Sequence, residues 1–62
     1  MITIEKILNN PSAYVARYNS IDTAKSNLSY KNNFIVKVGN EYWVTNGRYA
    51  GLLINAGFEY IK

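Results

Sequence analysis

The sequence predicts a small α+β domain that spans residues 1–62 as one unit. Helix signals with apolar side chains three and four positions apart dominate the N-terminal part. Two β-rich runs around a Gly-Asn pair follow in residues 34–45. No repeat or linker divides the chain, so the helices and the sheet should pack as one unit.

Two short helices are expected in the N-terminal part, over residues 3–8 and 20–28. Each begins at a hydroxyl side chain that can accept a hydrogen bond from the first helical turn, Thr3 or Ser20. Pro11 ends the first helix, because the residue before a proline avoids the helical region. The apolar faces consist of Ile4, Ile7 and Leu8 in the first helix and Ile21, Ala24 and Leu28 in the second.

Residues 11–18, between these helices, fit two structures. Asn10 as the N-cap and Pro11 at the first helical position favour another helix, with Tyr14 and Tyr18 on one face. The stretch AYVARY also alternates and carries Tyr and Val, which is typical of a strand. We take the helix as the first expectation and the strand as its alternative.

Residues 34–45 predict a β-hairpin with Gly39-Asn40 as its two-residue turn. Because this turn sets the register, the two faces of the hairpin can be written down. One face pairs Val38 with Glu41, Val36 with Trp43 and Phe34 with Thr45, and the other pairs Lys37 with Tyr42 and Ile35 with Val44. The first face should be buried, whereas the second is amphipathic and should turn its polar groups to water or a partner.

Residues 46–56 predict a helix, and residues 58–61 a last strand. Thr45 or Asn46 can cap the helix, and Gly57 stands where a helix ends in a left-handed residue. A right-handed crossover then sets the last strand parallel to residues 41–45 and beside 34–38, which completes a ββαβ unit with a three-stranded sheet. A second hairpin turn at Asn46-Gly47 is the alternative.

The hydrophobic core is expected to form around the hairpin and the helix that follows it. It should hold Trp43, Val36, Phe34, Leu53 and Phe58. The sequence leaves open whether Gly51, in the middle of the helix, faces this core or solvent.

The chain lacks the residues that several classes of function require. The chain has no cysteine and no histidine, which removes disulfides, thiolate metal sites and the commonest general base. The four carboxylates lie on different predicted elements, so we expect no catalytic, cofactor-binding or metal site. No apolar run approaches the roughly 20 residues of a membrane span, and no signal peptide is visible. A cytoplasmic protein without a membrane partner is therefore expected.

The aromatic and basic residues favour a binding function. Six tyrosines in 62 residues cannot all be core, because each hydroxyl needs a partner or water. Tyr and Arg dominate protein interfaces, so a protein partner is the first expectation, and self-association would also supply core area that so short a chain lacks. Nucleic acid is the alternative, because tyrosines beside cations can stack bases and hold phosphates. The candidate partner-binding residues are Tyr30, Lys31, Lys37, Tyr42, Arg48 and Tyr49.

The C-terminal half resembles a class of very small phage and prophage proteins. The resemblance rests on Tyr42-Trp43-Val44 and Ala56-Gly57-Phe58-Glu59. Those proteins carry a hairpin with a YWVV-like strand, a short helix and an AGYE-like C-terminal stretch. The resemblance implies a non-enzymatic, phage-encoded accessory protein that binds and modulates a host protein in the host cytoplasm. The many Asn, Lys, Ile and Tyr residues indicate an AT-rich genome, as in such phages.

Overall fold

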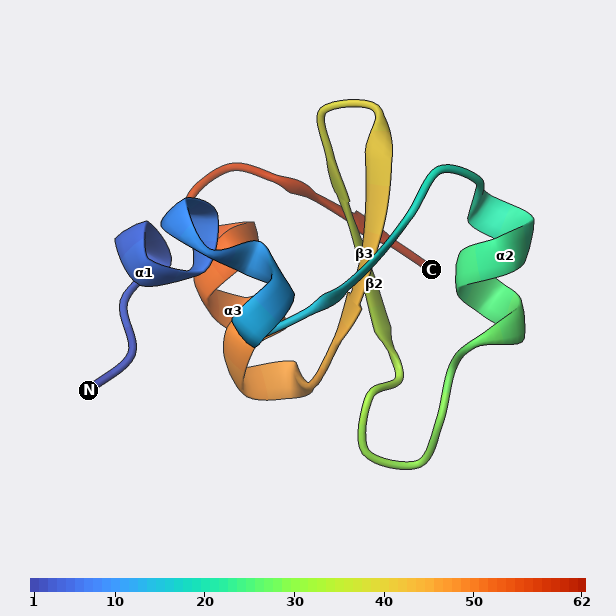
Figure 1. Ribbon diagram of the computed structural model, residues 1–62, viewed down its shortest axis with the longest axis horizontal. Helices are drawn as coiled ribbons and strands as arrows, with labels where there is room; N and C mark the ends of the chain where they lie inside the picture. Colours follow the sequence, from blue (N-terminus) through green and yellow to red (C-terminus); the bar gives the residue numbers. More distant parts are fainter.

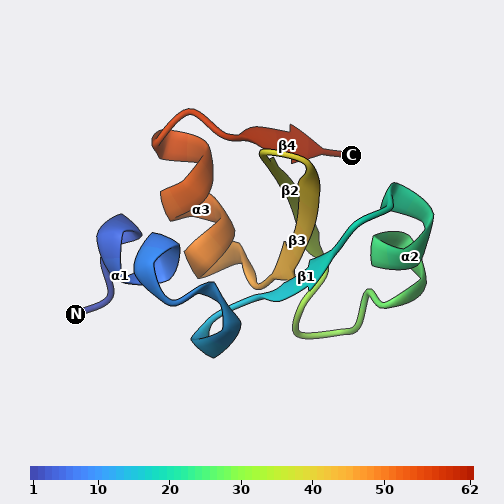
Figure 2. The same ribbon diagram turned by 45° about the horizontal axis from the view of Figure 1, so that its top comes forward.

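Three helices and a four-stranded antiparallel sheet make up the fold in the computed structural model, which describes all 62 residues (Figures 1 and 2). The strands lie in the order β1-β3-β2-β4. Helices α1 and α3 lie on one face of the sheet and α2 lies beyond the other (Figure 2). The elements are α1 Ile4–Asn9, the 3-10 turn η1 Pro11–Ala13, β1 Ala16–Tyr18, α2 Ile21–Ser26, β2 Phe34–Val38, β3 Glu41–Thr45, α3 Gly47–Asn55 and β4 Glu59–Ile61.

The β2–β3 hairpin has the register that its two-residue turn predicts. Gly39, the first central residue of the turn, has a positive φ of 62°, and no residue other than glycine has a positive φ in this chain. The turn therefore needs a glycine at this position. Every expected pair is present, from Val38 with Glu41 to Phe34 with Thr45. Val36 and Trp43 consequently share the face that α3 covers.

Helix α3 begins and ends at the residues expected from its caps. The Asn46 side chain accepts a hydrogen bond from the Tyr49 amide at 2.9 Å. At the other end Gly57 has φ of 105°, and the Phe58 amide donates to the Leu53 carbonyl at 3.1 Å. This pattern closes the helix with a left-handed glycine. The alternative of a second hairpin turn at residues 46–47 is therefore wrong.

Strand β4 lies where the crossover argument places it. It pairs antiparallel to β2 and so runs parallel to β3. The α+β class and the ββαβ order of the C-terminal half are thus confirmed, whereas the expected three-stranded sheet is wrong, because a fourth strand pairs with the outer side of β3.

This fourth strand comes from residues 11–18, for which the helix was the first expectation. The segment forms one 3-10 turn, closed by a hydrogen bond from the Tyr14 amide to the Pro11 carbonyl at 2.9 Å, and then extends. Extension is favoured because the outer side of β3 has main-chain groups that need partners, and β1 supplies them. The buried Thr45 hydroxyl also donates to the Tyr14 carbonyl at 3.3 Å.

The main core lies between the sheet and the helices α1 and α3. Of the five expected core residues, Val36, Trp43 and Leu53 are buried, and Phe34 and Phe58 pack against them as partly buried rings. The cluster is completed by Ile7, Val15 and Ala50. Trp43 keeps its indole N–H paired, because it donates to a Glu41 carboxylate oxygen at 2.9 Å.

The opposite face of the sheet holds a second, smaller core that was not expected. Ala24 of α2 covers Ile35 and Val44, and all three are buried. Tyr18 and Tyr42 pack at the rim of this cluster. Helix α2 therefore occupies the middle of the face that the hairpin pattern had left for a partner.

A glycine substitution within α3 and one just beyond its end should change stability in opposite directions. Gly57→Ala should destabilise by about 1–2 kcal/mol, because a Cβ disfavours the left-handed conformation. Gly51→Ala should stabilise by up to about 1 kcal/mol, because no atom beyond the helix's own neighbouring backbone lies within 4 Å of an added Cβ and alanine is the better helix former. Urea unfolding followed by Trp43 fluorescence measures both, and a stable Gly57→Ala variant would contradict the assigned helix end.

Candidate functional site

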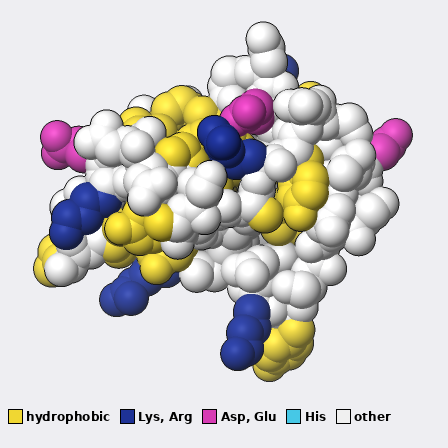
Figure 3. All heavy atoms as spheres, viewed as in Figure 1, with side chains coloured by type: hydrophobic (Ala, Val, Ile, Leu, Met, Phe, Trp, Pro, Cys, Tyr) yellow, Lys and Arg dark blue, Asp and Glu magenta, His cyan; other side chains and the backbone are white.

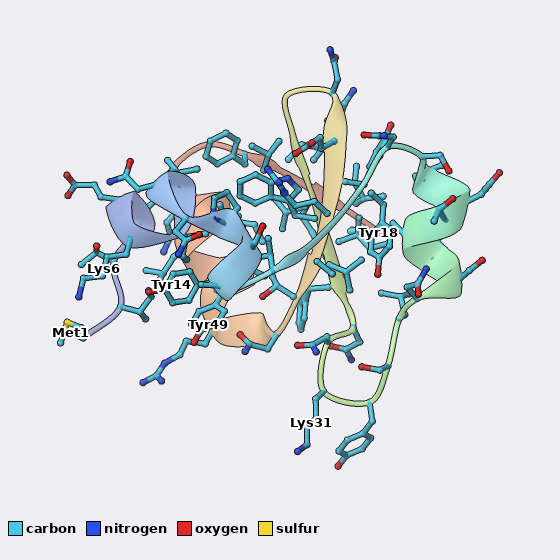
Figure 4. The ribbon with its side chains drawn as sticks, viewed as in Figure 1. Met1, Lys6, Tyr14, Tyr18, Lys31 and Tyr49 are labelled. Carbon is cyan, nitrogen blue, oxygen red and sulfur yellow. The ribbon has the colours of Figure 1, made fainter.

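Four of the six candidate residues lie toward the end of the sheet away from the β2–β3 turn. Tyr30 and Lys31 belong to the α2–β2 loop, and Tyr30 is 97% exposed. Arg48 and Tyr49 form part of the first turn of α3. Figure 4 shows Lys31 and Tyr49 on the lower side of the molecule. The α2–β2 loop and the first turn of α3 both lie on this side.

The other two candidates, Lys37 and Tyr42, lie near the opposite end of the sheet. They face each other across the hairpin, one pair away from the turn, and both are half-buried. Tyr42 also packs against the small core under α2. The structure therefore does not bring this pair together with the other four.

A contact between two tyrosines joins distant parts of the chain at the candidate site. Tyr14, which precedes β1, and Tyr49, on α3, meet edge to face with their ring centroids 5.5 Å apart and their planes at 86°. This arrangement places the positive edge of one ring on the negative face of the other. Both rings are half-buried, so each also reaches the surface.

The tyrosine pair separates two surface hollows. Tyr14 lines a hollow of about 340 Å³, and Tyr49 lines one of about 480 Å³. The first, here called the polar hollow, is bounded by Ser12, Tyr14, Val15, Ala16, Tyr18, Asn27, Ser29, Asn32 and Val44. The second, the apolar hollow, is bounded by Met1, Ile2, Arg48, Tyr49 and Leu52.

The polar hollow is suited to uncharged polar groups. No charged side chain lines it, and its floor is made of β1 and Val44 of β3. Hydroxyl and amide groups surround this floor, and the hydroxyls of Ser12, Tyr14 and Tyr18 make no hydrogen bond within the chain. Such groups are free to donate to or accept from a bound molecule.

The apolar hollow combines aliphatic walls with positive charge. Met1, Ile2 and Leu52 supply the apolar surface, and Arg48 lies at its margin. The Lys6 ammonium is close by, since it donates to the Met1 carbonyl at 3.4 Å. An apolar side chain of a partner, with a carboxylate beside it, would match this hollow.

The side of the molecule that holds the hollows is positively charged. The chain has seven cationic and four anionic side chains, and the one ion pair joins Arg17 to Glu41 at 3.8 Å. Figure 3 shows Lys and Arg groups beside hydrophobic groups along the lower part of this face, with no acidic group among them. Lys31 and Arg48 thus remain unpaired on this side.

The carboxylates do not assemble into a reactive cluster. Glu5 lies on α1, Asp22 on α2, Glu41 on β3 and Glu59 on β4, and none of them lines a hollow. No three acidic side chains come together in a group that could hold a metal ion. None of the helices has both the length and the apolar character that a membrane crossing requires.

Several residues of the site were missed by reasoning from sequence. Tyr14 was assigned to a helix face, and Met1, Ile2, Ser12 and Asn32 were not considered as site residues. The alternation in AYVARY was the one local signal for β1. Nothing local indicates that Tyr14 meets a residue of α3, because that contact depends on the whole fold.

Comparisons with protein-family models, with curated proteins and with solved structures find no match for this chain.

The exposed Tyr30 and the half-buried Tyr49 should differ in their effect on stability. Tyr49→Ala should cost roughly 2 kcal/mol, less than a fully buried ring, because it removes the contact with Tyr14. Tyr30→Ala should change stability by less than about 0.5 kcal/mol, since its side chain is almost wholly in solvent. Thermal unfolding of both variants checks this, and an equal loss in both would mean that Tyr30 packs against the domain.

Proposed function

We propose that the chain is a small non-enzymatic, phage-encoded accessory protein that binds and modulates a host protein. The proposed contact surface contains Tyr30, Lys31, Arg48 and Tyr49. The observation that carries the proposal is the Tyr14–Tyr49 pair, which stands between two hollows with unpaired cations to either side. Rigid aromatic rings beside hollows are the common anchors of protein interfaces.

The chemistry of this surface describes the partner that would fit it. An apolar side chain of the partner would enter the apolar hollow beside Leu52, and acidic side chains would meet Arg48 and Lys31. Uncharged polar groups would contact the polar hollow. The partner would therefore present an acidic surface with a projecting apolar residue. Lys37 and Tyr42 would contact a separate region of the partner, near the hairpin turn.

A nucleic-acid ligand is the second candidate, and the exposure of Tyr30 favours it. A ring that is 97% exposed and directly followed by a lysine can stack on a base while the lysine meets a phosphate. The two candidates differ in how binding responds to salt. Each phosphate contact contributes a slope of about −0.9 to log K against log salt for duplex DNA and about −0.7 for single strands.

Removal of two cations from the proposed surface should abolish capture of the host protein. The Lys31→Ala/Arg48→Ala variant should lose the bacterial protein that the wild-type chain retains from a nuclease-treated lysate. The Lys25→Ala/Lys62→Ala variant removes the same charge from residues outside the proposed contact surface, and it should retain that protein. Affinity chromatography with mass spectrometry of the retained proteins is the measurement.

The same variants distinguish the two candidates. If the wild type captures no specific protein but binds DNA or RNA with a salt slope of about −2 or steeper, nucleic acid becomes the better function. Equal loss of protein capture in both double variants would mean that net charge, and not the proposed surface, holds the partner.

A further inference from the structure

The register of the sheet determines which main-chain groups of β4 are free. A two-residue turn makes the flanking pair, Val38 and Glu41, a hydrogen-bonded pair. Alternate residues of an antiparallel strand direct their N–H and C=O groups to the same side, so Ile35 and Lys37 direct theirs to β4. They pair there with Ile61 and Glu59. Tyr60, between those two, therefore directs its N–H and C=O away from the sheet.

The same reasoning applies to β1 at the other edge. Tyr42 and Val44 direct their main-chain groups to β1, where they pair with Tyr18 and Ala16. Arg17 lies between those two residues, so its N–H and C=O also point out of the sheet. Each edge of the sheet thus offers one residue with both main-chain groups free.

The side chains at the two free residues differ in a way that decides what can pair with each edge. Tyr60 is 40% exposed, and the rest of its ring packs against Phe34 with the centroids 5.8 Å apart. Arg17 is a cation whose side chain is 43% exposed. Like charges directly opposite each other on adjacent strands destabilise the pairing, whereas aromatic pairs stabilise it.

We propose that β4 is a homodimerisation edge, at which a second copy of this chain pairs antiparallel so that Tyr60 lies opposite Tyr60 of the second copy. The two tyrosines exchange both N–H···O=C hydrogen bonds. Each Lys62 amide donates to the Phe58 carbonyl of the other copy, because these residues come next in the same register. Glu59 lies opposite Ile61, so no like charges meet.

The β1 edge does not accept a second copy in this way. The same two-fold pairing there would place the guanidinium of Arg17 opposite that of the other copy. The charge pattern therefore selects β4, and the result is a continuous eight-stranded sheet with β1 at both outer edges. The polar hollow lies along β1, at the opposite edge of the sheet from β4, so the dimer presents two copies of the candidate surface.

Sedimentation equilibrium from micromolar to millimolar concentration tests the proposal. The wild-type chain should shift toward twice the mass of one chain as concentration rises. The association should be weak, because a three-residue strand makes a small interface. Tyr60→Pro should raise the dimer dissociation constant by at least about tenfold, since each copy loses the N–H that points to its partner. The fold should persist, because that N–H takes no part in the pairing with β2.

Two further variants make the test specific. Tyr60→Lys keeps the N–H but opposes two cations across the two-fold axis, and it should weaken dimerisation as well. Arg17→Pro makes the matching change at the β1 edge and should leave dimerisation unchanged. A wild-type chain that stays monomeric at millimolar concentration overturns the proposal. So does a dimer that survives both Tyr60 variants or that only Arg17→Pro disrupts. None of these outcomes depends on whether a host protein is captured.

Discussion

The Gly39-Asn40 turn is the constraint on which the rest of the structure depends. A turn of two residues allows one pairing of β2 with β3, and a slip by one residue would move every side chain to the other face. The observed pairing places Val36 and Trp43 under α3 and places Ile35 and Val44 under α2. Both cores therefore follow from one short turn, and each helix finds an apolar surface that matches it.

The same pairing also determines the two edges and, through them, the candidate site. The main-chain N–H and C=O groups of Tyr42 and Val44 in β3 point away from β2. Residues 16–18 can therefore pair with them as a fourth strand. This pairing draws the preceding 3-10 turn against the start of α3, where Tyr14 meets Tyr49. The polar hollow beside that contact exists because β1 is a strand and forms most of its floor. The proposed binding surface is thus a consequence of the sheet, although none of its charged residues belongs to the sheet.

The features that the sequence predicts correctly are those that depend on neighbouring residues. The caps at Thr3, Ser20 and Asn46, the left-handed Gly57 and the hairpin register all result from interactions within a few positions. The strand at residues 16–18 is different. Pro11 starts a 3-10 turn as readily as a helix, and three residues are too few for local propensity to decide. Their conformation is set by the unpaired side of β3, which no local pattern reveals.

The same reason explains which parts of the site could be predicted. Tyr30, Lys31, Arg48 and Tyr49 were chosen as candidates from residue type alone, because tyrosines beside cations are typical of interfaces. Their grouping on one side could not be predicted, and neither could the separation of Lys37 and Tyr42 from them. Tyr14 was missed because its role depends on a contact with a residue 35 positions later in the chain.

Amide hydrogen exchange along β1, in a dilute sample, tests the central claim of a single fixed register most directly. The amides of Ala16 and Tyr18 should exchange slowly, because they are paired with Val44 and Tyr42, and the Arg17 amide between them should exchange fast. Slow exchange at Arg17 with fast exchange at its two neighbours would show a register shifted by one residue. Fast exchange at all three would show that β1 does not pair with the sheet, and the polar hollow would lose its floor.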